Sequence, residues 1–343
     1  MASLFPHEVL RASANRVLQD ANILQYGRST GYEPLKEKIA DLYNQEGFET
    51  RAENIMITSG SQQALDIICR YHANQKITIE SPSYLGAMNI FRLNGLEQEA
   101  IDLNLLGIEI EAFEKSFIRS KLAYLIPDFQ NPTGISYGQD KREEVAKIVK
   151  KNGGVLIEDA PYAKLYFEKE GQSISSLVPN NSYHLGTFSK TLAPALRIGW
   201  IRADKKLLEP LIAYKEAMDL HTNGLSQAIL NDYLCEGEVY RNHLTLLREN
   251  YKQKMEFFAQ SLDKILPTFS YNRPKGGMFI YGSLPHIDSS KLIDKALKNG
   301  VVFVPAVEFY GSDEPTDEIR FNFSLGSEEE VILGLERIAE LLG

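Results

Sequence analysis

A lysine and an arginine lie seven residues apart in a stretch that is rich in hydroxyl side chains. Thr187, Ser189 and Lys190 belong to the run Gly-Thr-Phe-Ser-Lys-Thr, and Arg197 follows it. Hydroxyl groups and a guanidinium can together hold a phosphate, and the neighbouring lysine would supply a reactive amine. A Ser-Lys pair in a loop is by itself most often a solvated surface feature. This chemistry therefore needs partners elsewhere in the chain.

Candidate partners follow other apolar runs. Glu158 and Asp159 directly follow the run Val155–Ile157, and Asn131 lies in a loop after another such run. Open α/β sheets bind ligands at the carboxyl ends of their strands, so the side chains of Asp159 and Asn131 are placed for binding. Ser61 and Gln62 join an expected strand to an expected helix, whose free amides suit an anion such as a phosphate. The alternative for Asp159 is a loop or helix-cap carboxylate.

Arg320 lies in the run Ile319–Phe323, which has the length and apolar character of a strand. A guanidinium flanked by apolar residues fits a carboxylate through two parallel hydrogen bonds. The alternative is an ion pair at the surface of an edge strand. Taken with the other candidates, we favour the carboxylate of a substrate as its partner.

The elements that must position these residues follow a regular pattern. Apolar runs of strand length alternate with amphipathic stretches, which predicts a mostly parallel sheet between helices. The expected strands cover residues 54–58, 76–80, 122–126, 155–158, 184–188 and 197–201, and the expected helices cover 61–72, 83–94 and 139–152. A long helix is expected over 237–265, followed by strands at 277–281, 301–304 and 319–323 and a helix over 327–342.

The composition excludes several classes of function. The 343 residues carry 37 basic and 46 acidic side chains, a formal net charge of −9, which disfavours nucleic acids and anionic lipid surfaces as partners. No apolar run approaches the length of a membrane span, and the first residues show no secretory signal, so we expect a cytoplasmic protein. Cys69 and Cys235 stand in apolar helical contexts and are expected to be buried, without a disulfide or a metal site.

Several short phrases occur in the order found in one family of enzymes. They are Tyr26-Gly27 with Gly31–Leu35, Ser59–Gln63, Asn131–Gly134, Asp159–Tyr162, Ser189-Lys190 with Arg197–Gly199, and Arg320. In these phrases the chain resembles fold-type-I pyridoxal-phosphate-dependent aminotransferases of class I/II. Three further phrases, Tyr84–Ala87, Asp219–Thr222 and Arg273–Phe279, are similar to the branch of 2-aminoadipate and kynurenine aminotransferases.

The resemblance implies an α/β fold with a large domain, whose mostly parallel seven-stranded sheet lies between helices, and a smaller α+β domain. We expect an N-terminal part of the small domain, or an arm, over residues 1–25. The large cofactor-binding domain would cover residues 26–245 and the small C-terminal domain residues 246–343.

The resemblance also implies a role for each residue around pyridoxal 5'-phosphate. Lys190 would form the Schiff base and then move the proton, while Asp159 would pair with the pyridine nitrogen and keep it protonated. Tyr162 and Asn131 would hydrogen-bond the phenolic oxygen of the ring, and Tyr84 would stack on its face.

The phosphate of the cofactor would bind Ser61, Gln62, Thr187, Ser189 and Arg197. Tyr26 would reach the phosphate of a neighbouring subunit, which implies a homodimer with shared active sites. Arg320 would bind the α-carboxylate of the substrate, with Asn131 as a second donor.

The implied activity is transamination of an L-amino acid of 2-aminoadipate, aromatic or branched-chain type, with a 2-oxo acid such as 2-oxoglutarate. Two alternatives stay open: a ligand-sensing, aminotransferase-like domain of a transcriptional regulator, and a related pyridoxal-phosphate lyase. In similar proteins a segment that closes over the substrate precedes the phrase that corresponds to Ser3–Pro6, whereas this sequence starts two residues before that phrase. We therefore expect an open or incomplete substrate pocket. We expect the anchoring of the cofactor to be intact, because every residue assigned to it is present.

Overall fold

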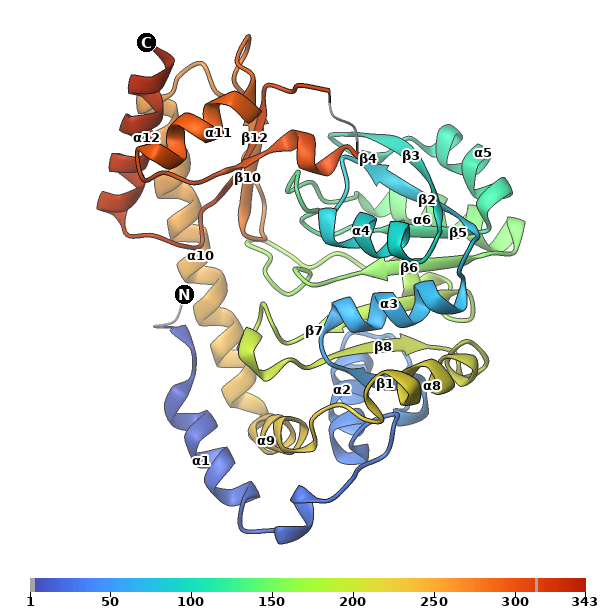
Figure 1. Ribbon diagram of the computed structural model, residues 1–343. Helices are drawn as coiled ribbons and strands as arrows, with labels where there is room; N and C mark the ends of the chain where they lie inside the picture. Colours follow the sequence, from blue (N-terminus) through green and yellow to red (C-terminus); the bar gives the residue numbers. More distant parts are fainter. Residues whose placement is uncertain (1–3, 312–313) are drawn as a thin grey trace.

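The computed structural model describes residues 4–311 and 314–343, shown in Figure 1. In these residues a large sheet has the strand order β1-β8-β7-β6-β5-β2-β3-β4. Its strands are β1 (Ile55–Thr58), β2 (Lys76–Ser81), β3 (Glu97–Asn104), β4 (Gly107–Ile108), β5 (Leu122–Leu125), β6 (Val155–Asp159), β7 (Ser182–Thr187) and β8 (Gly199–Ala203). The central strands β3, β2, β5, β6 and β7 run parallel, whereas β8, β1 and β4 are antiparallel to their neighbours. The predicted α/β class with a mostly parallel sheet is confirmed.

The expected number of seven strands is too small, because the sheet has eight. The expected strands from the apolar runs are all present, but β3 and β4 were not among them. In β3 exposed and half-buried side chains follow one another without a buried one, so no apolar run marks it. The strand β4 has only two residues, which is too short for any periodicity to appear.

Helices cover both faces of the large sheet (Figure 1). One face packs against α3 (Ser61–Tyr71), α4 (Leu85–Leu93) and α8 (Lys205–Asp219) through a core of aliphatic side chains such as Ile67, Ile79 and Leu211. The other face packs against α5 (Ile110–Ser120), α6 (Gln139–Asn152) and the short α7 (Ile174–Leu177) through Phe117 and Val149. This double cover explains the continuous apolar runs of the central strands.

A second group of elements surrounds a smaller sheet with the order β11-β12-β10-β9. Its strands are β9 (Ser270–Tyr271), β10 (Phe279–Ser283), β11 (Val304–Pro305) and β12 (Glu318–Asn322), and its helices are α11 (Ser289–Lys298) and α12 (Glu328–Leu342). The expected strand over 301–304 is wrong in extent, because regular pairing begins only at Val304. Val302 is largely exposed, so the apolar run there does not mark a buried strand.

The long helix α10 (Gly237–Ile265) connects the two groups, as predicted for this range (Figure 1). Its first turns pack with α2 (Glu33–Gln45) and α9 (Gly224–Cys235), and its second half packs under the smaller sheet. Near the N-terminus α1 (His7–Val17) lies beside α9. Short 3-10 turns complete the chain at Ala21–Leu24, Ala52–Asn54, Pro194–Leu196 and Ala306–Phe309.

The two cysteines differ. Cys69 is buried in α3 as expected, whereas Cys235 is exposed, which contradicts the expectation. Cys235 is the last residue of α9 and lies one position beyond Leu234, where the buried stripe of that helix ends. Among the described residues no helix has both the length and the apolar character needed to cross a membrane.

Candidate active site

A cavity of about 380 Å³ opens where the carboxyl ends of β6 and β7 meet β12 of the smaller sheet. The residues that line it are Ser61, Gln62, Tyr84, Ile126, Asn131, Asp159, Pro161, Tyr162, Thr187, Ser189, Lys190, Arg197, Phe279, Arg320 and Asn322. The cavity therefore brings together the site residues expected from the sequence, with the exception of Tyr26. Their sequence positions span 61 to 322, and the fold alone makes them neighbours.

One wall of the cavity has the character of an anion site. Ser61 and Gln62 form the first turn of α3, where backbone amides are free of intrahelical partners. Thr187 Oγ1 lies 3.0 Å from Ser189 Oγ, and Arg197 Nη2 donates to the carbonyl oxygen of Ser59 at 3.0 Å. These hydroxyls, amides and one guanidinium surround a space that fits a phosphate group.

A glycine makes this close approach of the guanidinium possible. Gly60 has φ of +90°, in the region that favours glycine, and a Cβ there would overlap the guanidinium of Arg197. Gly199 likewise has no room for a Cβ, because the backbone of Gly60 and Ser61 lies against it. The turn before α3 is thus shaped so that backbone and arginine share one anion.

The same turn is anchored from behind by Asp219. Its Oδ2 accepts hydrogen bonds from Gln63 Nε2 at 2.8 Å and from Ser59 Oγ at 3.2 Å, and its carboxylate also pairs with Lys215. These hydrogen bonds and the Lys215 ammonium keep the pKa of Asp219 below its usual value against the effect of burial. No role for Asp219 was predicted from the sequence, although it opens the phrase Asp219–Thr222. It positions the turn before α3 and is not among the residues that line the cavity.

Asp159 ends β6 and is buried at the floor of the cavity. Its Oδ2 accepts a hydrogen bond from the Tyr124 hydroxyl at 2.7 Å, and its Oδ1 is buried with no partner among the described residues. Burial raises the pKa of Asp159 to about 6, against the opposing effect of the Tyr124 hydrogen bond. An unpaired carboxylate oxygen of this kind suits a cationic N–H donor, such as the protonated ring nitrogen of pyridoxal phosphate.

Lys190 follows β7 and faces the same space. Burial lowers the pKa of its amine, and the charges of Arg320 and Arg197 lower it further. The side chain forms no hydrogen bond or ion pair within the described parts of the chain. A neutral, unpaired amine is the form that attacks an aldehyde carbon, so the surroundings of Lys190 favour its nucleophilic state.

Arg320 reaches the cavity from β12 and joins the two sheets. Its Nη1 donates to Asn131 Oδ1 at 2.6 Å, and its guanidinium lies 4.2 Å from the ring centre of Phe279. The Nε atom of Arg320 is buried and has no partner in the residues that the structure describes. A carboxylate bound there would satisfy that free donor, and Asn131 is close enough to take part.

The two aromatic residues expected at the ring of the cofactor also line the cavity. The Tyr84 hydroxyl accepts a hydrogen bond from Gln62 Nε2 at 3.1 Å, which ties Tyr84 to the first turn of α3. Tyr162 is buried, and its ring contacts Phe279 edge-on with centroids 5.6 Å apart. Burial raises the pKa of Tyr162 well above its usual value, so its hydroxyl stays protonated and can donate.

Tyr26 lies outside the cavity. The residue is 83% exposed, and its ring contacts that of His221 edge-on, with centroids 5.9 Å apart. The predicted contact of Tyr26 with a second subunit stays a prediction.

Four lining residues received no role from the sequence: Ile126, Pro161, Phe279 and Asn322. Two of them carried a usable signal. Asn322 stands two positions after Arg320 on β12, and alternate residues of a strand share one face. Pro161 follows Asp159 at the end of β6, where ligands of open sheets bind. Ile126 and Phe279 read only as apolar core.

Comparison with known proteins agrees with this geometry. The family model for aminotransferase class I and II matches residues 2–338. Aromatic-amino-acid aminotransferase 1 of Thermococcus litoralis is 32% identical over 357 positions, covering 98% of this chain and 85% of the relative. The 2-aminoadipate transaminase of Thermus thermophilus is 33% identical over 352 positions, covering 99% of this chain and 87% of the relative.

A solved structure supports the same relationship. The crystal structure of Pyrococcus horikoshii kynurenine aminotransferase, in complex with PMP, superposes with a TM-score of 0.92 at 31% identity and covers 98% of this chain and 87% of that chain. The predicted aminotransferase activity, the pyridoxal 5'-phosphate cofactor and the resemblance to this branch are thereby confirmed. The chain belongs to the class I and II aminotransferase family.

Proposed function

We propose that this aminotransferase uses an L-amino acid of the 2-aminoadipate, aromatic or branched-chain type as donor and a 2-oxo acid such as 2-oxoglutarate as acceptor. One observation carries the proposal: a single cavity holds an unpaired amine, a buried carboxylate with a free oxygen, and an arginine with a free Nε. The amine would attach the cofactor covalently, the carboxylate would bind its ring nitrogen, and the arginine would bind the carboxylate of the substrate. The relatives that act on aromatic amino acids, kynurenine and 2-aminoadipate support the choice of donors.

The cofactor, when bound, supplies a ring that accepts the electron pair left at the α-carbon of the donor. Lys190 would hold the cofactor covalently, and once the donor has replaced it, its freed amine would carry the proton between the α-carbon and the cofactor. Asp159 would keep the ring nitrogen protonated. Tyr162 and Asn131 would donate to the ring oxygen, and Tyr84 would pack on the ring face.

The remaining residues would orient the two ends of the bound molecules. The first turn of α3, Thr187, Ser189 and Arg197 would fix the phosphate, with Asp219 holding that turn. Arg320 would hold the α-carboxylate of the donor. The bond that breaks must stand perpendicular to the cofactor ring. By holding the α-carboxylate, Arg320 would keep the bond to that group out of this orientation. The carboxylate would then be retained, which favours transamination over loss of carbon dioxide.

We further propose that the protein is a cytoplasmic homodimer with shared active sites. Within each chain, the domain boundaries would lie at about residues 26 and 246. The high exposure of Tyr26 beside His221 is consistent with a role toward a second copy. The two separate sheets support the division. Both cysteines are free, as is usual for proteins of reducing compartments.

The test uses the purified protein loaded with pyridoxal phosphate and a panel of 2-aminoadipate, kynurenine, phenylalanine, leucine and glutamate. At least one donor is expected to convert the bound cofactor to its amine form, seen by absorbance, while releasing one equivalent of the matching 2-oxo acid. Release of carbon dioxide or of an elimination product would instead support a lyase. Cofactor binding without conversion by any donor would contradict the proposed enzyme activity and favour a ligand-sensing domain.

A further inference from the structure

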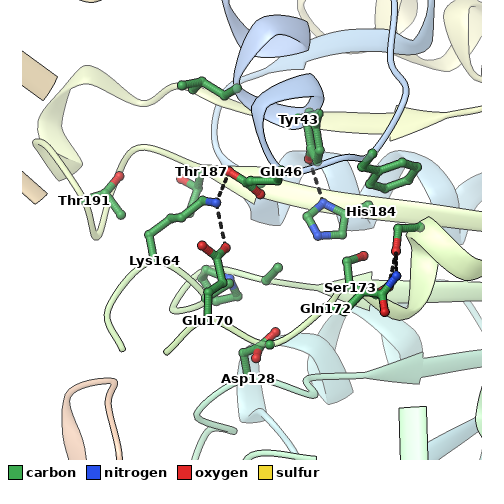
Figure 2. A pocket seen from close by; sticks show the side chains of 18 of the residues that line it. Tyr43, Glu46, Asp128, Lys164, Glu170, Gln172, Ser173, His184, Thr187 and Thr191 are labelled. Atoms are coloured by element: carbon green, nitrogen blue, oxygen red, sulfur yellow. Dashed lines mark hydrogen bonds and ion pairs between the residues drawn. The ribbon is translucent and has the colours of Figure 1, made fainter. Parts of the chain in front are cut away.

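A second cavity, of about 290 Å³, lies beside the active site on the sheet face that α7 covers (Figure 2). Its walls come from α2, the loop after β6, the start of α7 and the strands β7 and β8. Thr187 and Pro161 line both cavities, so the two spaces are separated by a shared wall. We name this space the acid-lined cavity. Its other lining residues take no part in the proposed reaction.

The charges at this cavity do not balance. Lys164 forms ion pairs with Glu46 and with Glu170, the latter at 2.6 Å, so one ammonium lies between two carboxylates. Figure 2 shows these three side chains meeting at one side of the cavity. Asp128 also lines the space, but the buried Arg142 neutralises it at 2.6 Å. The lining therefore keeps an excess of one negative charge.

Burial makes this excess costly. It raises the pKa of Glu170 in spite of the neighbouring Lys164, and the charge of Glu46 adds to the rise. A second cation beside the two carboxylates would balance the remaining negative charge. Glu46 and Glu170 remain partly exposed, with 39% and 28% of their side-chain surfaces accessible, so a ligand can reach them.

A hydrogen-bond chain fixes a donor on another wall of the cavity. Trp200 Nε1 donates to the Tyr43 hydroxyl at 2.8 Å, and the same hydroxyl lies 2.7 Å from His184 Nδ1. An indole N–H can only donate, so the Tyr43 oxygen accepts from Trp200. Among the described residues His184 Nδ1 is then the acceptor within reach of the buried Tyr43 proton, so we assign that proton to the bond with Nδ1. Burial lowers the pKa of His184, so the neutral ring then carries its proton on Nε2.

This Nε2–H group has no hydrogen-bond partner among the residues that the structure describes. In Figure 2 the second ring nitrogen of His184 points away from Tyr43, into the space next to Glu170 and Ser173. The walls of the cavity also include the apolar side chains of Leu42 and Trp200. The cavity thus offers a pair of carboxylates, apolar wall surface and a neutral donor.

We propose that the acid-lined cavity binds a small organic amine in its cationic form. The ammonium would lie next to Lys164, on the cavity side of the Glu46 and Glu170 carboxylates, and a hydroxyl or carbonyl oxygen of the ligand would accept a hydrogen bond from His184 Nε2. The apolar or aromatic body would pack against Leu42 and Trp200. This site is separate from the substrate site, and its existence does not depend on which donor the enzyme uses.

The test uses N,N-dimethyltyramine, whose tertiary amine cannot condense with an aldehyde and so cannot react with pyridoxal phosphate. Titration of the holoenzyme by calorimetry is expected to show saturable binding of one molecule per chain. The uncharged analogue 4-ethylphenol should bind at least about tenfold more weakly, because it lacks the cation. Binding should be unchanged in Arg320→Ala, which alters the substrate site alone.

Variants locate the probe. The double variant Glu46→Gln with Glu170→Gln should lose at least about tenfold in affinity, whereas Glu49→Gln, an exposed glutamate nearby, should leave it unchanged. Tyr43→Phe removes the hydroxyl that sets the tautomer of His184 and should weaken binding severalfold. Circular dichroism and turnover of each variant check that the fold persists.

Three results would overturn the proposal. They are the absence of saturable binding to the holoenzyme, equal affinity of the double variant and Glu49→Gln, and loss of binding in Arg320→Ala. The first would mean a cavity filled by water alone. The last would place the probe in the substrate site.

Discussion

The active-site cavity and the acid-lined cavity share Thr187 and Pro161, yet their electrostatics are opposite. The active site gathers the guanidinium groups of Arg197 and Arg320 and the amine of Lys190 around one buried carboxylate. The acid-lined cavity gathers carboxylates around one lysine. One sheet therefore presents a site for phosphate and carboxylate groups on one side of a thin wall and a site for a cation on the other.

The two cavities also differ in how the chain builds them. The active site is made of short runs at the ends of strands, such as Asp159–Tyr162 and Thr187–Lys190, where consecutive residues serve one ligand. The acid-lined cavity combines one loop run, Glu170–Ser173, with residues scattered over several helices, strands and loops from Leu42 to Tyr240. Short runs of this kind can be recognised in a sequence, whereas scattered single residues cannot.

The largest difference is expected when the lysine of each cavity is replaced in turn. Lys190→Ala should abolish turnover while the fold persists, because the covalent attachment and the proton carrier are both lost. Lys164→Ala, the matched change in the acid-lined cavity, should keep kcat within about twofold, since it touches no reacting atom. Steady-state assays with the best donor decide this. Full activity of Lys190→Ala would remove it from the mechanism.

A second test compares one buried carboxylate of each cavity, Asp159 in the active site and Asp128 in the acid-lined cavity. Asp159→Asn should lower kcat by about two to four orders of magnitude with little loss of fold, because an amide does not hold the ring nitrogen protonated. Single-turnover kinetics with saturating donor measure the chemical step directly. An unchanged rate would show that Asp159 is not the partner of the ring nitrogen.

Asp128→Asn should act on stability instead. It leaves Arg142 buried without its ion pair, so the free energy of unfolding should fall by about 3–5 kcal/mol. Denaturant unfolding of the apoprotein gives this value. A loss of kcat without a loss of stability would mean that the pair serves the reaction rather than the fold.

The pH dependence of stability sharpens the contrast further. In the folded apoprotein the pKa of Asp159 is about 6, above the ordinary value of 3.8, so folding takes up a proton between these values. The stability that this group contributes is present below pH 3.8 and is lost as the pH rises through 6, by about 3 kcal/mol in total. Asp159→Asn should therefore flatten the stability curve of the apoprotein between pH 4 and pH 7. Identical curves for the two proteins would contradict the raised pKa.

The smallest effect is expected at Arg320. Arg320→Ala should raise KM for every amino donor by about 10- to 100-fold, because a charge-assisted contact to the shared carboxylate is lost. The matched Arg320→Lys variant should recover part of this loss, since it keeps the charge but not the planar fork. A rise of KM for some donors only would assign Arg320 to side-chain recognition.

Much of the fold and of the active site could be predicted from the sequence. The buried parallel strands appear as apolar runs, and Lys190, Asp159 and Arg320 stand in phrases that the family shares. The strand β3 could not be found in this way, since its side chains show no buried face. Tyr124 could not be assigned to Asp159, because a tyrosine in a buried strand reads as core until the neighbouring strand is in place.

The helix α10 has a mechanical consequence. Its 29 residues span about 43 Å, and its buried side chains belong to two cores, with Tyr240 and Leu244 in one and Met255 and Leu262 in the other. A small bend of α10 between these two groups of residues would move β12 and so displace Arg320 relative to Lys190. We expect donors of different length to be accommodated by small changes in this bend.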